Sequence, residues 1–231
     1  MSSFLQGDEL ARVTELNERN AAKRKLHTRA YEIESLLEDD EHFRLVGHLR
    51  DVKPDGLWSI SDTEPMTIHH MQLEIVIHAA TLTITDVDVF MHVHPQTYCP
   101  DALPKYDQLI GLAIARGFTS KVKELFGGPR ACTHIGALIN AMAPVAIQSM
   151  WSFGAIQRER SGRANEPLND AERRADHLRN LNTCHVWSTD GPILELFANE
   201  QPVPIPLWAK RRLQDRGIDP AIWSPQAGIQ D

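Results

Sequence analysis

Three cysteines and eleven histidines carry most of the chemistry that this 231-residue sequence offers. Cys132 and His134 flank Thr133 directly before a long apolar run. If that run is a helix, its start presents free N–H groups and the positive end of the helix dipole, which favour a thiolate. A thiolate beside an imidazole can attack a substrate or exchange a proton with it. We therefore predict Cys132 and His134 as catalytic residues.

The other two cysteines also lie near expected element ends, where functional sites are often built. Cys99 lies in a proline-rich turn, and His185 directly follows Cys184. Because thiolates and imidazoles are good ligands for zinc and iron, we expect Cys99, Cys132, Cys184 and His185 to share a metal site. The sequence lacks the paired C-x-x-C spacing that is typical of zinc sites. The alternative is that the thiols are small apolar core residues.

His92 and His94 form a second candidate pair. Alternate residues of a strand point to the same face, so these two imidazoles could bind one metal ion, with Asp88 nearby. His70 could join them if the strand registers agree. The alternatives are that His92 and His94 face solvent and that His70 is an ordinary histidine at the end of its strand.

Three alternating segments predict the scaffold for these residues. Residues 42–53, 67–78 and 81–94 alternate apolar and polar side chains. A turn signal at residues 53–56 follows the first segment, and a short connection joins the second to the third. Neighbouring strands with short connections pair antiparallel, which predicts a β-meander in an α+β fold. Helices should cover its apolar face, which includes Met71, Leu73, Ile75 and Ile77.

Helical periodicity and capping signals predict the remaining elements. Asn169 to Glu172 form a capping box that predicts a further helix start. Residues 154–167 are expected to form an exposed loop and residues 193–197 a strand. The expected helices cover residues 8–25, 103–116, 119–127, 133–151 with a kink or break at Pro144, and 207–216.

We expect three parts in the chain: an N-terminal helix over residues 1–26, one α+β domain over residues 27–200, and a C-terminal extension over residues 201–231. The apolar stripe of the N-terminal helix is narrow, which favours packing against a second copy and thus a homodimer.

Composition narrows the setting. The net charge of −7 argues against nucleic acid as the main partner, since phosphate binding needs a clustered basic surface. The most apolar stretch, residues 135–151, is short for a membrane span and carries polar side chains. An odd number of cysteines argues against a secreted disulfide framework, so we expect a cytoplasmic protein without a membrane partner.

Several short motifs occur in one order along the chain: Arg29, Gly47, Asp51, Lys53, His70-Met71, Pro95, Cys99, Leu109 to Gly117, Cys132-Thr133-His134 and Cys184-His185. This order resembles a bacterial family catalogued as domain of unknown function 2889. The resemblance covers roughly residues 27–200 and implies no settled activity. A fainter similarity, in the order of strands and late cysteines, is to NifU-like iron–sulfur scaffolds.

Three functions stay open at this point. The leading hypothesis is a small-molecule enzyme, a metal-dependent or cysteine-dependent hydrolase or lyase. Five tryptophans and the apolar helix leave room for an aromatic or apolar substrate. The alternatives are an accessory protein that binds a metal or an iron–sulfur cluster, and an interaction domain without catalysis.

Overall fold

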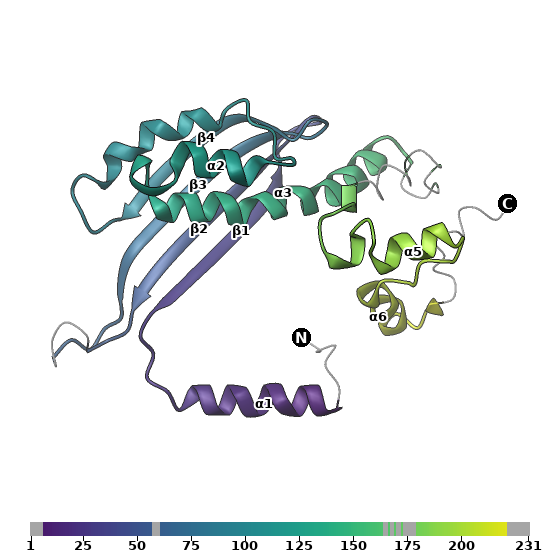
Figure 1. Ribbon diagram of the computed structural model, residues 1–231, viewed down its shortest axis with the longest axis horizontal. Helices are drawn as coiled ribbons and strands as arrows, with labels where there is room; N and C mark the ends of the chain where they lie inside the picture. Colours follow the sequence, from purple (N-terminus) through teal and green to yellow (C-terminus); the bar gives the residue numbers. More distant parts are fainter. Residues whose placement is uncertain are drawn as a thin grey trace. The chain divides into compact units, whose positions relative to one another are not determined.

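Four strands form one antiparallel sheet in the order β1-β2-β3-β4 (Figure 1). The strands are β1 (Thr28–Leu37), β2 (His42–Lys53), β3 (Met66–His78) and β4 (Thr83–Val93). The predicted meander and the α+β class are confirmed. β1 was not predicted, because most of its side chains are exposed and its apolar residues do not alternate regularly.

The computed structural model describes residues 7–56, 61–163, 166, 169, 172 and 179–220. The chain divides into two compact units, Met1–Gly154 and Ala155–Asp231. The sheet and its covering helices belong to the first unit. The boundaries expected near residues 26 and 200 stay predictions. Among the described helices, none combines the length and the apolar character needed to cross a membrane.

The core lies between one face of the sheet and the helices that cover it. The alternating residues of β2 and β3 supply the sheet side of this core, as predicted. Figure 1 shows α2 (Phe118–Phe126) and α3 (Thr133–Arg160) along this face. The side chains that are at most 2% exposed include Phe43, Leu45, Leu49, Met71, Leu73, Ile75, Ile77, Ile135, Leu138, Ile139 and Met142.

Gly47 sets how closely α3 approaches the sheet. A Cβ atom at this position would lie 2.6 Å from the Met142 sulfur and 3.2 Å from a methyl carbon of Leu138. Both distances are shorter than normal van der Waals contact. The missing side chain of Gly47 therefore lets the helix pack directly on β2.

Two helix predictions in the first unit need correction. The helix expected over residues 103–116 is wrong, because a 3-10 helix, η1 (Cys99–Leu109), occupies this region, and Pro100 and Pro104 deprive it of backbone donors. The loop expected over residues 154–167 is wrong at its start, because α3 continues through Pro144 to Arg160. The predicted helix over residues 119–127 is confirmed by α2.

The remaining helices lie in sequence on both sides of these elements. The N-terminal helix α1 (Gly7–Ala21) has no buried residue. The strand expected over residues 193–197 is wrong, because α5 (Pro192–Ala198) is helical and begins with a proline after Gly191, where the fixed φ of proline suits a first helical turn. The helix expected over residues 207–216 is confirmed by α6 (Leu207–Asp215).

The predicted capping box is also present. Asn169 N–H donates to Glu172 Oε2 over 2.8 Å, and Glu172 N–H donates to Asn169 Oδ1 over 2.9 Å. The helix expected to follow lies outside the described residues. A short 3-10 helix, η3 (His185–Trp187), precedes α5.

Candidate active site

A buried carboxylate lies at the centre of the site. Asp51 continues the inward alternation of Leu45, Gly47 and Leu49 near the end of β2, and only 1% of it is exposed. A charged carboxylate at such a position is unstable unless other groups neutralise it and donate hydrogen bonds. The partners of Asp51 therefore define the site.

Arg29 supplies the neutralising charge. It lies directly opposite Asp51 in the pairing of β1 with β2. Its Nε donates to Oδ1 and its Nη2 donates to Oδ2, both over 2.7 Å, in the two-pronged geometry that suits a guanidinium and a carboxylate. The hydrogen bonds from Arg29 lower the pKa of Asp51 to about 2. Asp51 is therefore ionised at neutral pH.

Three histidines surround the same carboxylate. His69 lies opposite Asp51 on β3, and its Nδ1 is 3.1 Å from Oδ2. His134 Nε2 is 3.4 Å from Oδ2, and His27 Nε2 is 3.2 Å from Oδ1. The rings of His69 and His134 stack with their centroids 3.7 Å apart. Asp51 thus joins β1, β2, β3 and the first turn of α3.

The carboxylate charge favours one tautomer of His134. Asp51 Oδ2 lies 3.4 Å from Nε2, and a negative charge at this distance favours the proton on that nitrogen. In a neutral ring, Nδ1 then keeps its lone pair. Burial lowers the pKa of His134, so the ring is neutral at neutral pH. His134 therefore presents Nδ1 as a proton acceptor.

That acceptor faces a thiol. The Sγ of Cys132 lies 3.7 Å from His134 Nδ1. The backbone of Cys132 is held by Tyr106, whose hydroxyl accepts from Cys132 N–H over 3.0 Å and donates to Cys132 C=O over 3.1 Å. Tyr106 is fully buried, and burial raises its pKa, so its hydroxyl keeps its proton. Cys132, His134 and Asp51 thus lie in the order that a nucleophile, its base and the group orienting that base require.

The start of α3 adds hydrogen-bond donors beside the thiol. The first bond of this helix runs from Gly136 N–H to Cys132 C=O over 3.0 Å. Helix geometry therefore leaves the N–H groups of Thr133, His134 and Ile135 without an acceptor inside the helix. Such groups favour negative charge on a bound molecule.

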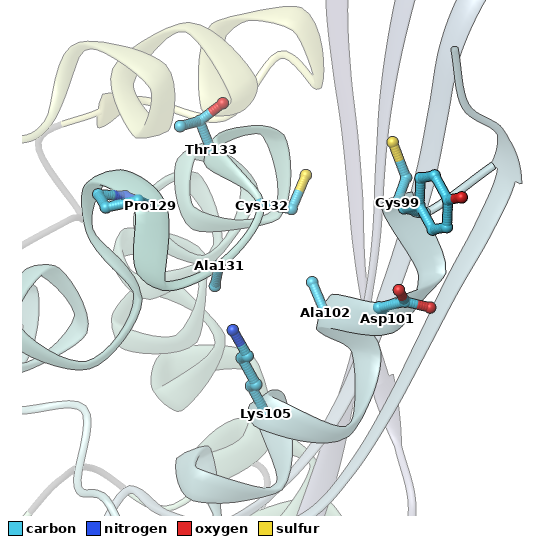
Figure 2. A pocket seen from close by; sticks show the side chains of 9 residues that line it. Cys99, Asp101, Ala102, Lys105, Pro129, Ala131, Cys132 and Thr133 are labelled. Carbon is cyan, nitrogen blue, oxygen red and sulfur yellow. The ribbon is translucent and has the colours of Figure 1, made fainter. Parts of the chain in front are cut away.

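A pocket of about 390 Å³ opens beside Cys132. Figure 2 shows Cys99 and Cys132 on its opposite walls, one from η1 and one from the segment before α3. Lys105 connects these two walls, because its Nζ donates to the carbonyl of Arg130 over 2.6 Å. The volume lies in the range of small-molecule sites.

The structure brings together part of the predicted set. Cys132 contacts His134, and Cys99 lines the same pocket. Cys184 and His185 lie in the second unit, so their sharing of this site stays a prediction. His92 and His94 have different partners: His92 Nε2 bonds Gln72 Oε1 over 2.7 Å, and His94 Nδ1 bonds the Gln96 carbonyl over 2.9 Å.

Sequence reasoning did not select Asp51 or His69 for the site. Together with His134 they could hold a metal ion, since one ligand atom from each lies within 4.8 Å of the other two. The alternation of both strands offered a signal, because it places Asp51 with Leu49 and His69 with Met71 on the buried face.

Comparison with known proteins identifies the family. The family model described as "Protein of unknown function (DUF2889)" matches residues 27–148, more than half of the chain, and the chain belongs to this family. The matched range contains Arg29, Asp51, His69, Cys132 and His134. No curated protein and no solved structure matches the chain significantly. The fainter likeness to NifU-like scaffolds is not shown.

Proposed function

We propose that this member of the DUF2889 family is a cysteine-dependent hydrolase that acts on a small acyl compound. The observation that carries the proposal is the alignment of three groups. Cys132 Sγ lies 3.7 Å from His134 Nδ1, and the other nitrogen of that ring lies 3.4 Å from Asp51 Oδ2.

Each group has a defined role in the reaction. His134 Nδ1 takes the thiol proton, and Cys132 Sγ attacks the carbonyl carbon of an ester, thioester or amide. The imidazolium then protonates the leaving group as the carbonyl–leaving-group bond breaks, which leaves a thioester on Cys132. Water, deprotonated by His134, hydrolyses this thioester and regenerates the thiol.

Asp51 and Arg29 position the proposed base, His134, on the side away from Cys132. The charge of Asp51, 3.4 Å from His134 Nε2, favours the tautomer that accepts at Nδ1 and stabilises the imidazolium formed after proton transfer. Arg29 keeps Asp51 ionised through its two hydrogen bonds. Arg29 and Asp51 are therefore positioning residues.

The N–H groups of the first α3 turn suit the other charged centre. Negative charge develops on the carbonyl oxygen as the thiolate attacks, and backbone donors that are already in place stabilise it. The pocket beside Cys132 provides the space for the acyl or leaving group, with the exposed ring of Tyr98 on its wall. An aromatic or apolar substituent suits this side.

A metal-dependent hydrolase is the second candidate, and the approach of Asp51, His69 and His134 ligand atoms within 4.8 Å favours it. Imidazole and carboxylate are a suitable set for zinc. The position of Arg29 favours the thiol mechanism over the metal mechanism. Arg29 bonds both carboxylate oxygens of Asp51, so its positive charge would lie next to a bound metal ion and repel it.

Mass spectrometry of the intact protein after mixing with a p-nitrophenyl ester tests the proposal. We expect rapid release of one equivalent of nitrophenol and an acyl group on Cys132, unaffected by a chelator. Cys132→Ser should abolish both, whereas Cys99→Ser is the matched control in the same pocket and should retain them. Turnover that survives Cys132→Ser and is lost with the chelator would establish the metal mechanism instead.

A further inference from the structure

Three histidines gather on the sheet face that the helices do not cover. His48 on β2 alternates with the buried Leu49, and His70 on β3 alternates with the buried Met71, so both point to the outer face. His92 on β4 is exposed on the same side. The three residues lie on three neighbouring strands.

Their imidazoles are in contact. His70 Nε2 lies 3.3 Å from His48 Nδ1, and the ring centroids of His70 and His92 are 4.6 Å apart. A register shift in the β3–β4 pairing contributes to this approach: His70 pairs with Val93 and Met71 with Met91, so His92 is the extra residue between them. Bulges of this kind redirect a side chain locally.

The spacing of the first pair suits one metal ion. Two Zn–N bonds of about 2.0–2.1 Å at a tetrahedral angle separate their nitrogen atoms by about 3.3–3.4 Å. The observed separation between His70 Nε2 and His48 Nδ1 is 3.3 Å. His70 is the middle residue, and its ring centroid lies 4.6 Å from that of His92, which is the third candidate ligand.

Neighbouring side chains support this role for His92. Gln72 Oε1 lies 2.7 Å from His92 Nε2, and Gln72 Nε2 in turn donates to Glu74 Oε1 over 2.7 Å. The second bond fixes the amide orientation, so Gln72 presents oxygen to His92. The proton of His92 is then on Nε2, and Nδ1 is the free ligand atom. Outer hydrogen bonds of this type commonly orient metal-binding histidines.

The charges around the three rings are mixed. Glu32 lies opposite His48 in the β1–β2 pairing, and Arg50 lies opposite His70 in the β2–β3 pairing. Glu32 and Arg50 therefore bring one negative and one positive charge to this face.

We propose that His48, His70 and His92 form a binding site for a divalent transition-metal ion such as Zn²⁺ or Cu²⁺. The three nitrogen ligands suit these ions, and the exposed position leaves room for a water ligand. The site is separate from the Cys132 pocket, because it lies on the opposite face of the sheet. It does not depend on the proposed hydrolase activity.

Titration of the full chain with Zn²⁺, followed by calorimetry, tests this site. His70→Gln and His92→Gln should each weaken one binding event by about tenfold or more, whereas His94→Gln is the matched control on a neighbouring exposed imidazole and should bind as the wild type does. His69→Gln shows whether Asp51, His69 and His134 also bind zinc. Electron paramagnetic resonance of the Cu²⁺-loaded protein should show couplings to nitrogen ligands. Fewer coupled nitrogens in His92→Gln than in the wild type would support the same assignment.

Equal zinc affinity and stoichiometry in His70→Gln, His92→Gln and His94→Gln would overturn the proposal. His92 is exposed, so His92→Gln should leave the melting temperature unchanged. A change in zinc affinity in this variant would therefore not be due to unfolding. Acylation of Cys132 should also be unchanged in His92→Gln, so a failure here is distinguishable from a failure of the hydrolase proposal.

Discussion

The Nε2 atom of His134 lies 3.4 Å from Oδ2 of Asp51, which connects the first turn of α3 to the end of β2. The proposed base therefore depends on how α3 packs on the sheet. Gly47 allows the close approach of this helix, and Tyr106 holds the residue that precedes it. The alignment of the proposed catalytic residues is thus a consequence of the core packing.

Asp51→Asn should lower the free energy of unfolding by about 1–3 kcal/mol, between the values typical of exposed and of buried ion pairs. The substitution removes one partner of an ion pair whose carboxylate is buried, and leaves the partly exposed Arg29 without its counter-charge. Glu124→Gln is the control, because its pair with Lys121 has the same 2.7 Å length but is exposed and should contribute less than about 1 kcal/mol. Urea denaturation measures both. Equal losses in the two variants would contradict the role assigned to burial.

The same carboxylate predicts a pH dependence. The folded-state pKa of Asp51, about 2, lies below the unfolded value of about 3.9. Its contribution to stability is therefore fully present above the unfolded pKa and is lost as the pH falls from about 4 towards about 2. The stability difference between the wild type and Asp51→Asn should shrink over this range. A difference that stays constant down to pH 2 would show that Asp51 is not held ionised.

Gly47→Ala should destabilise the fold by about 1–3 kcal/mol, because the added methyl group would collide with Met142 and Leu138. Gly136→Ala is the matched control within α3. No atom lies within 4 Å of a Cβ at that position, and alanine favours a helix over glycine, so stability should rise by up to about 1 kcal/mol. Thermal unfolding measures whether each variant is less or more stable than the wild type. A neutral Gly47→Ala would mean that α3 can move away from β2 without cost.

The strands around the core could be predicted because alternation is a local property of the sequence. It placed Met71, Leu73, Ile75 and Ile77 on the buried face, and the structure confirms this. Elements with competing signals were predicted less well. Prolines turned the expected helix at residues 103–116 into η1, and a short apolar run at residues 193–197 fits a helix as well as a strand.

The site was predictable only in part for a related reason. Cys132 and His134 are close in sequence, so their contact follows from one helix start. The partners of His134 are distant in sequence. Alternation shows that Asp51 and His69 face inward, but the strand register that sets them opposite each other and the helix position that brings His134 to them are tertiary properties. Whether His70 could join His92 depended on strand register in the same way, and the two rings do lie close together.

The alkylation rate of Cys132 tests the central claim most directly. Iodoacetamide labels both thiols of the pocket, and peptide mass spectrometry separates their rates, so Cys99 is an internal reference with similar access. If His134 acts as the proposed base, Cys132 should react at least about tenfold faster than Cys99 at pH 7, and His134→Gln should bring the two rates together. Equal rates in the wild type, unchanged by His134→Gln, would contradict the assignment of Cys132 as an activated nucleophile.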